Sequence, residues 1–377
     1  MKKILFLIKV IFLVYVFSQC KSHNGKLIAS LENIPDSTVL NIIDLDNRIT
    51  LDKIPVFNNK FEFVYNFKSP KKILITEDHP KYPKYQKFLW LENAKIYIRG
   101  NYDYFVNAKV EGSASNIIHE KFETLVRKFE NTLSDLRLSA RTTNDQLSKD
   151  SIEKEINIIT NQHIEEKSQL YLENIQSDVT LSNLNYEIVY YSSVFSKTDI
   201  KKIYLALPER FKISDNGLII NKFISLPEIP KIGEKFIDCT QRTPEGKSES
   251  ISKNLGKYTI IEFWASSCGP CRAEHPIMKK MYDLYHSKGL NIISISCDDN
   301  IDNWVNAIKK DSMTWTNISD LNGWNNEAFM SYGIKAIPQM IILDENGYII
   351  DNHFDIQYLV HTPDLVLQNQ KISITKR

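Results

Sequence analysis

A pair of cysteines separated by two residues limits this chain more than any other feature. Cys268 and Cys271 lie in the segment WASSCGPCRAEHP, which includes the end of the apolar run 258–264. Apolar residues then recur at helical spacing, so the pattern predicts a strand, a tight turn that holds two thiols, and a helix that begins near Cys268. Unpaired N–H groups and the dipole at such a helix start favour a thiolate. The segment therefore predicts a dithiol that can open and close as a disulfide.

The chain around this dithiol alternates strands with helices from residue 232 onward. The predicted strands are residues 236–240, 258–265, 290–297, 314–318, 339–343 and 348–351. The predicted helices are 277–285, 301–310 and 326–332. Asn346-Gly347 is predicted to form the turn between the last two strands. Such alternation favours an α/β domain with a partly parallel sheet.

The N-terminal part of the chain is predicted to be built differently. Short apolar runs separated by turn residues occupy residues 26–110, and they predict a small antiparallel sandwich or barrel. Asn58-Asn59, ahead of alternating aromatic residues, predicts a hairpin turn. The predicted fold class is therefore multidomain, with an all-β sandwich-like domain, a helical middle region and a C-terminal α/β domain.

Helical spacing occupies the middle of the chain. Apolar stripes begin at Phe122 and Ile152, and shorter helices are expected at 184–195 and 198–207. Two prolines, at positions 227 and 230, indicate a linker. The predicted domains are residues 20–113 for the β-rich domain, 114–226 for the helical region and 227–377 for the α/β domain.

The first 19 residues have the pattern of an export signal. Lys2 and Lys3 precede an apolar run, 4–17, that is short for a membrane span, and Cys20 follows it. A cysteine at this place resembles a bacterial lipobox, in which the thiol is acylated and the preceding segment is removed. We therefore expect a lipoprotein signal peptide over 1–19 and a lipid on Cys20. The protein would then face the periplasm from the inner or outer membrane of a Gram-negative-type cell. An ordinary signal peptide and an uncleaved anchor stay open as alternatives.

Net charge and cysteine content bear on the partners and disulfides that the chain can have. With 47 basic and 46 acidic residues the formal net charge is +1, and no basic block is long enough to favour a nucleic-acid partner. Of the five cysteines, Cys239 and Cys297 lie in short β-like runs. We expect both to be small buried hydrophobic residues, with an accessory disulfide as the alternative.

The CGPC motif and its surroundings make residues 232–354 resemble the thioredoxin-fold domain of exported thiol–disulfide oxidoreductases related to TlpA and ResA. The segments FNNKFEF and LWLENAKIYIRG resemble the β-rich domain of unknown function that leads exported thioredoxin-like lipoproteins. The resemblance implies a redox disulfide between Cys268 and Cys271. Cys268 would attack a substrate disulfide, and Cys271 would then attack Cys268 and release the reduced substrate. This interpretation predicts a protein-disulfide reductase.

Two carboxylates match the pattern of that family. Glu262 lies on a predicted strand, six residues before Cys268, where thioredoxin has a buried acid. The resemblance implies that it takes the proton of Cys271. Glu274, three residues after Cys271, matches the glutamate of a CxxCxxE pattern that tunes the thiols. A solvated helix position is the alternative for Glu274.

A further match is Ile337-Pro338, just before the predicted strand 339–343. In the thioredoxin fold such a proline is cis, adjoins the dithiol and holds the preceding residue ready to pair with an extended substrate. Ser267 departs from the pattern, because most relatives have Trp immediately before the first cysteine. This departure leaves substrate affinity and redox potential open.

Three other functions compete with a reductase. A peroxiredoxin-like thiol peroxidase shares the fold but needs Thr where Ala265 stands. A zinc site would use Cys268, Cys271 and His275, yet no second pair of ligands completes it. A tethered binding protein with an accessory redox domain is the third. Our interpretation is a membrane-tethered reductase without cofactor or metal. It would act on protein or small-molecule disulfides and receive electrons from a transmembrane or other thiol donor.

Overall fold

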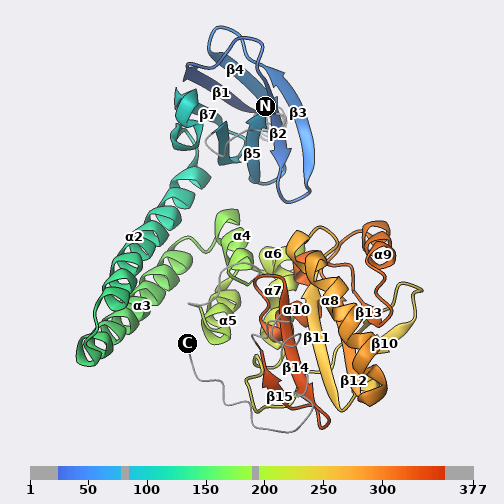
Figure 1. The fold of residues 1–377 in the computed structure, drawn as a ribbon. Coiled ribbons are helices and arrows are strands. Elements are labelled where there is room, and N and C mark those ends of the chain that lie inside the picture. Colours follow the sequence, from blue (N-terminus) through green and yellow to red (C-terminus); the bar gives the residue numbers. More distant parts are fainter. Residues whose placement is uncertain (1–23, 78–84, 189–194, 353–377) are drawn as a thin grey trace, which may run out of the picture. The chain divides into compact units, whose positions relative to one another are not determined.

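The computed structural model describes residues 24–77, 85–188 and 195–352 (Figure 1). The chain divides into two compact units, Met1–Thr180 and Leu181–Arg377. The first holds a β-rich domain and two long helices, and the second holds shorter helices and a mixed α/β domain. The predicted fold class is thereby confirmed. The predicted signal segment and Cys20 lie outside the described residues.

Two four-stranded sheets open the N-terminal unit, with the orders β4-β1-β7-β8 and β3-β2-β5-β6. Their strands are β1 (Gly25–Glu32), β2 (Val39–Asp44), β3 (Ile49–Pro55), β4 (Lys60–Tyr65), β5 (Lys71–Glu77), β6 (Gln86–Leu91), β7 (Lys95–Asn101) and β8 (Lys109–Glu111), with a 3₁₀ helix at Tyr102–Asn107 between the last two. Residues of both sheets share a core. Because side chains alternate along a strand, Phe61, Phe63 and Tyr65 of β4 all enter it. The predicted antiparallel pairing is found between the other neighbouring strands but is wrong at β1 and β7, which pair in parallel.

The predicted turn at Asn58-Asn59 is present, although the strands that it joins do not pair as a hairpin. Phe57 and Lys60 exchange two backbone hydrogen bonds of 3.0 Å, and the two asparagines between them have φ values of 49° and 61°. Both central residues of a type I′ turn need positive φ, and Asn tolerates it better than most residues. The turn carries the chain from β3 in one sheet to β4 in the other.

Two long helices complete this unit. They are α2 (Ala114–Thr142) and α3 (Gln146–Glu173). The Phe122 ring lies 4.7 Å from that of Tyr171, and the Phe129 ring stacks on His163 at 4.0 Å. Since higher numbers in α2 meet lower numbers in α3, the two helices form an antiparallel hairpin.

Shorter helices open the second unit. They are α4 (Asp178–Tyr186), which begins just before the unit boundary, α5 (Lys197–Ala206), α6 (Glu209–Lys212) and α7 (Asp215–Ser225). A capping box of Ser196 and Asp199 starts α5. The sequence did not predict α7, whose Lys222 forms a 3.0 Å ion pair with Glu327 of the α/β domain. Helices from the predicted region 114–226 therefore occur in both units.

A five-stranded sheet of order β13-β12-β11-β14-β15 forms the centre of the α/β domain. Its strands are β11 (Tyr258–Trp264), β12 (Leu290–Ser296), β13 (Thr316–Ile318), β14 (Gln339–Asp344) and β15 (Ile349–Asp351). The helices are α8 (Gly269–Tyr285), α9 (Ile301–Lys310) and α10 (Glu327–Tyr332), with 3₁₀ turns at Ser252–Asn254, His286–Lys288 and Gly323–Asn325. The first three strands in this order run parallel to one another, and the last two join antiparallel. The predicted partly parallel sheet is thus confirmed.

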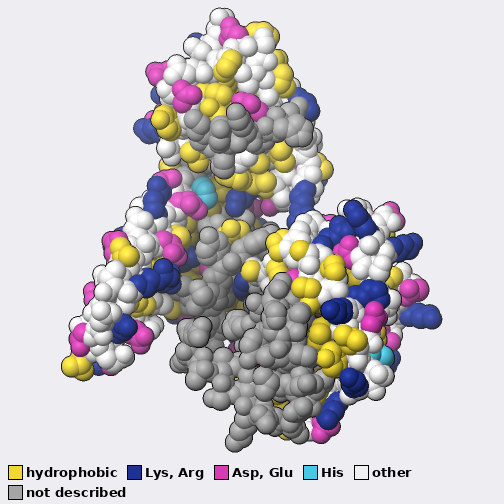
Figure 2. All heavy atoms as spheres, viewed as in Figure 1, with side chains coloured by type: hydrophobic (Ala, Val, Ile, Leu, Met, Phe, Trp, Pro, Cys, Tyr) yellow, Lys and Arg dark blue, Asp and Glu magenta, His cyan; other side chains and the backbone are white. Residues whose placement is uncertain are grey.

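Helices cover both faces of this sheet, and β11 is consequently buried at every position. One face packs on α8 and α9 through residues such as Ile260, Trp264 and Met278. The other face packs on α10 through residues such as Phe263. Alternation along β11 therefore points Glu262 to the α8 face, between Ile260 and Trp264. In Figure 2, basic and acidic side chains are interspersed over the visible described surface.

The predicted strand at 236–240 is wrong. The strand in this region is β9 (Thr240–Arg242), which pairs with β10 (Ser248–Ser250) outside the main sheet. Residues before it run beside the turn between β14 and β15, where Phe236 N–H donates to the Gly347 carbonyl at 2.9 Å. Lys235 adds an isolated bridge to Tyr348. Hydrogen bonds to a turn satisfy this backbone without a continuous strand ladder.

Candidate active site

The two cysteines lie where β11 passes into α8. Cys268 is the N-cap of α8 and is half-buried, whereas Cys271 is fully buried one turn into the helix. A disulfide joins them, with 5.4 Å between their Cα atoms. The Cys271 N–H donates to Cys268 Sγ at 3.2 Å. That N–H and the helix dipole would stabilise a thiolate on Cys268 once the disulfide opens.

A buried aspartate fixes the loop before Cys268. Asp298, two residues after β12, accepts hydrogen bonds from the N–H and hydroxyl of Ser266, at 2.9 and 2.5 Å. The hydroxyl of Ser296 donates to the same carboxylate at 2.6 Å. Ser267, in the position where relatives have Trp, is exposed beside this anchored segment. The loop is therefore held from the neighbouring strand while its outer side faces solvent.

The Ile337–Pro338 peptide bond is cis, as the resemblance to the thioredoxin fold implies. Phe263 of β11 pairs with Gln339 of β14, so the antiparallel register carries Pro338 to the end of β11, where the dithiol loop begins. Ile337 and Cys268 are both half-buried at the edges of the two cores of this domain. The strand pairing thus brings the proline loop beside the cysteines, although about 70 residues separate them in the sequence.

Beneath the cysteines, Glu262 is fully buried on β11. Its Oε2 accepts a hydrogen bond from the hydroxyl of Ser294, the residue paired with it on β12. Ser294 in turn accepts from Trp315 Nε1 at 2.7 Å. The other oxygen, Oε1, lies 3.0 Å from Nε2 of His275. A buried carboxylate needs such partners, because leaving it unpaired would cost several kcal/mol.

His275 extends this chain of polar groups toward the surface. Its Nδ1 lies 2.8 Å from Oδ2 of Asp311, the residue that follows α9. Arg272 donates to both oxygens of Asp311, from Nε at 2.8 Å and Nη2 at 2.7 Å. The sequence therefore folds so that Glu262, His275, Asp311 and Arg272 form one connected network, and its outer end is partly exposed.

The opposite charges in this network raise the pKa values of its basic groups and lower that of Asp311. Burial by itself lowers the pKa of His275, but the hydrogen bonds and charges of Glu262 and Asp311 outweigh burial and raise it above its ordinary value. The hydrogen bond from Arg272 lowers the pKa of Asp311, with a smaller contribution from His275. Asp311 in turn raises the pKa of Arg272. The structure thus favours a charged imidazole between two carboxylates.

From the sequence, His275 was expected to matter only as a ligand of a possible zinc site. Both of its ring nitrogens already face carboxylates, and the two thiols that would join it are in a disulfide. In the part of the chain that the structure describes, no group of three or more His, Cys, Asp or Glu could hold a metal ion. The spacing of Cys271 and His275 indicates a shared helix face. No local pattern, however, predicts that Asp311 completes the network.

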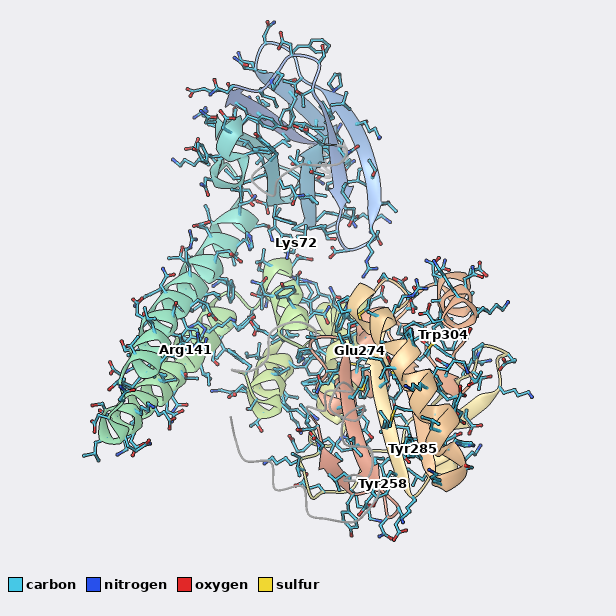
Figure 3. The ribbon with its side chains drawn as sticks, in the orientation of Figure 1. Lys72, Arg141, Tyr258, Glu274, Tyr285 and Trp304 are labelled. Carbon is cyan, nitrogen blue, oxygen red and sulfur yellow. A yellow bond between two sulfur atoms is a disulfide. The ribbon has the colours of Figure 1, made fainter. Side chains whose placement is uncertain are left out.

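The other predicted residues lie as follows. Glu274, which Figure 3 labels, is half-buried in the second turn of α8. Cys239 and Cys297 are buried and free, so the prediction of small hydrophobic residues is confirmed. Burial raises the pKa of each of these two thiols to about 12, which keeps them protonated and unreactive.

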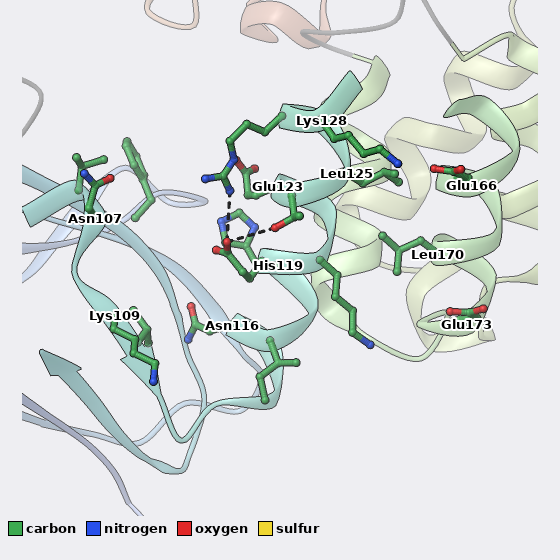
Figure 4. A pocket seen from close by; sticks show the side chains of 18 of the residues that line it. Asn107, Lys109, Asn116, His119, Glu123, Leu125, Lys128, Glu166, Leu170 and Glu173 are labelled. Carbon is green, nitrogen blue, oxygen red and sulfur yellow. Dashed lines mark hydrogen bonds and ion pairs between the residues drawn. The ribbon is translucent and has the colours of Figure 1, made fainter. Parts of the chain in front are cut away.

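The N-terminal unit has a hollow of its own, with a volume of about 1640 Å³ (Figure 4). Residues of β6, β8, α2 and α3 line it. His119 and Glu123 project into it from α2, and Glu166 faces it from α3. An ion pair of 3.3 Å between Arg127 and Glu120 lies in its wall. Since both signs of charge alternate around the hollow, its lining favours no particular ligand charge.

Comparisons with known proteins agree with this geometry. Residues 231–357 match the Redoxin family, and residues 24–117 match a domain of unknown function, DUF4369. The chain is 27% identical over 128 residues to the thiol-disulfide oxidoreductase ResA of Bacillus cereus, which is 34% of this chain and 72% of that protein. It is 29% identical over 123 residues to the thioredoxin-like protein YneN of Bacillus subtilis, covering 32% of this chain and 70% of that protein.

One similar solved structure is the thioredoxin domain of a thiol-disulfide oxidoreductase from Bacteroides vulgatus. It is 27% identical, covers 36% of this chain and 98% of that chain, and has a TM-score of 0.34. From the family matches, the chain carries a DUF4369 domain followed by a redoxin domain of the ResA-like thiol–disulfide oxidoreductase class. Among the described residues, no helix has the length and apolar character needed to cross a membrane.

Proposed function

We propose that this protein reduces disulfide bonds in other proteins outside the cytoplasm, while tethered to a membrane. The observation that carries the reaction is the disulfide between half-exposed Cys268, at a helix N-terminus, and fully buried Cys271. Only one of the two sulfurs is accessible to a large substrate. The names of the relatives, thiol-disulfide oxidoreductases, support the same reaction class.

The reaction proceeds in two exchanges. The Cys268 thiolate attacks one sulfur of the substrate disulfide, a new S–S bond forms, and the other substrate sulfur leaves as a thiolate. Cys271 then loses its proton and attacks Cys268 Sγ, which restores the Cys268–Cys271 disulfide and releases the second substrate thiolate. The substrate gains two electrons and two protons, and the enzyme loses them. A dithiol donor, such as a transmembrane thiol carrier, reverses the oxidation of the enzyme.

The remaining site residues have roles in this proposal. Glu262 accepts the proton of Cys271, and Glu274 tunes the thiols from the same helix. The backbone of Ile337, held by Pro338, pairs with an extended substrate beside Cys268. Ser267 leaves the surface next to the nucleophile small and polar, so a bulky peptide is not excluded there.

The reaction is tested by insulin reduction with the full chain and a dithiol reductant. We expect the wild-type chain to accelerate precipitation of the insulin B chain well above the reductant alone. The Cys271→Ser variant cannot complete the second exchange and is expected to accumulate a mixed disulfide with its substrate, visible by non-reducing gel electrophoresis. A wild-type chain that consumes peroxide rapidly but leaves insulin intact would contradict the reductase and favour a thiol peroxidase.

The membrane tether rests on the sequence pattern alone, with Cys20 as the proposed acylated residue after a signal peptide at 1–19. We expect cells that express the wild-type chain to incorporate labelled palmitate into it and to retain it in the membrane fraction. Cys20→Ala is expected to abolish the label. Equal labelling of the two proteins would show that Cys20 is not the lipid site.

A further inference from the structure

His275 has no role in the reaction as described so far, although it lies in the middle of the site. Its side chain is fully buried, and the rings of Trp264 and Trp315 lie 4.9 and 6.5 Å from it. Its Nε2 lies 3.0 Å from Glu262 and its Nδ1 lies 2.8 Å from Asp311. An imidazole enclosed by indoles and held at both nitrogens has one orientation available to it.

The two carboxylates determine which protonation state fits. A neutral imidazole has one N–H, and its other nitrogen is an acceptor. That acceptor would face a carboxylate oxygen without a proton between them. An imidazolium donates to Glu262 and to Asp311 at once. Arg272 pairs with both oxygens of Asp311, so a cluster with Glu262 and Asp311 ionised has two negative and two positive charges.

We propose that His275 is a positioning residue of the dithiol reaction. As an imidazolium between Glu262 and Asp311, it pairs with the Glu262 carboxylate and orients it to accept the proton of Cys271. This inference rests on the proposed function, because it concerns the second exchange of that reaction.

The geometry connects His275 to that exchange. Cys271 and His275 are four residues apart on α8 and therefore lie on one face, about one helical turn from each other. Glu262 points toward the same face from β11 and is hydrogen-bonded to His275. In the second exchange the S–S bond between Cys271 and Cys268 forms, the bond between Cys268 and the substrate breaks, and the electron pair leaves on the substrate sulfur. The proton of Cys271 passes to Glu262 and from there to solvent.

The described contacts place the following ionisable groups around the imidazole. Glu262 faces it from β11, Asp311 from the residue after α9, and Arg272 reaches Asp311 from α8 itself. The neutral groups are Ser294, which donates to Glu262 from β12, and the flanking indoles. Without His275, the Ser294 hydroxyl would be the remaining hydrogen-bond donor to Glu262 among the described residues, and the positive charge beside this carboxylate would be gone. A buried carboxylate that has lost its counter-charge is costly to keep, and it is then a poorer partner for the proton of Cys271.

The test measures the second exchange directly, with oxidised glutathione as the probe. Reduced full-length protein attacks it to form the Cys268–glutathione disulfide, and release of the second glutathione reports the attack by Cys271. Single-turnover rates are measured between pH 5 and 9 for the wild type, His275→Gln and His275→Met. His286→Gln is the matched control, because His286 is exposed and follows the same helix.

We expect both His275 variants to release the second glutathione at least about tenfold more slowly near pH 7, with a profile whose inflection moves to higher pH. His286→Gln should follow the wild type. A merely structural role would lower the rate equally at every pH, so a parallel profile, or one superimposed on the wild type, would overturn the inference. If the wild-type protein released no second glutathione at any pH, that result would instead contradict the proposed function.

A second measurement needs no variant and is independent of turnover. The ¹⁵N chemical shifts of the His275 ring in the wild-type protein are expected to show two protonated nitrogens at pH 7, above the ordinary pKa of histidine. A ring with one unprotonated nitrogen at that pH would overturn the inference even if the enzyme reduces disulfides normally.

Discussion

Cys268→Ser is expected to lower catalysed insulin reduction to the background rate of the reductant, a loss on the order of 10³-fold or more. The reason is that Cys268 is the half-exposed sulfur at the N-terminus of α8, whereas Cys271 is fully buried. A serine hydroxyl is not ionised near neutral pH and does not exchange with disulfides. Cys271 alone therefore has no access to a protein substrate. The measurement is the initial rate of insulin precipitation with the full chain at fixed reductant concentration.

Cys297→Ser is the matched control for this experiment. Cys297 is also a cysteine of the α/β domain, but it is buried and free, and burial raises its pKa to about 12. We expect the variant to retain wild-type activity, with at most a modest loss of stability from a hydroxyl in the core. Undiminished insulin reduction by Cys268→Ser would show that the assigned nucleophile is wrong. Equal loss in both variants would show that the assay reports folding rather than chemistry.

The dithiol and its supporting fold were predictable because their signals are local. A buried strand, a helix with one apolar face and a turn each have a characteristic spacing over a few residues. This is why the strand at 258–264, the helix at 301–310 and the Asn58-Asn59 turn appear in the structure nearly as predicted. Pro338 was recognised through the resemblance to the thioredoxin fold, because it stands directly before a predicted strand, although its place beside Cys268 depends on the pairing of β11 with β14.

The network below the dithiol was not predictable in the same way. Asp311 is 36 residues after His275 in the sequence, and nothing near it marks a helix-end aspartate as the partner of a buried histidine. The strand expected at 236–240 failed for a related reason, because hydrogen bonds to a distant turn replace the ladder there. Helix α7 was missed although Ser214 and Asp215 form a normal helix start. The consecutive apolar run Leu218-Ile219-Ile220 is equally compatible with a short buried strand, and Gly217 beside it is a poor helix former, so the segment lacks a clear helical period.

Glu262→Leu is expected to destabilise the α/β domain by about 3–5 kcal/mol at pH 6, because it leaves one side of a buried imidazolium without its counter-charge. His275→Met is expected to cost a similar amount, since it leaves the Glu262 carboxylate buried with only a hydroxyl donor. The double variant removes both charges together, while Asp311 keeps its pairing with Arg272. It should therefore cost less than the sum of the singles by about 2–3 kcal/mol.

The sign of the pH dependence follows from His275. Its pKa in the folded protein is raised, so its stabilising contribution is complete below the unfolded-state value of about 6.5 and is lost as pH rises through the folded-state value. The coupling between Glu262 and His275 should therefore be largest near pH 6 and should shrink in alkaline solution. Urea unfolding of the oxidised full chain, followed by tryptophan fluorescence, measures it. Of the five tryptophans, only Trp90 lies outside the second unit, so the signal reports mainly on the domain that contains the pair. Additive single-variant effects at pH 6 would show that Glu262 and His275 do not stabilise each other.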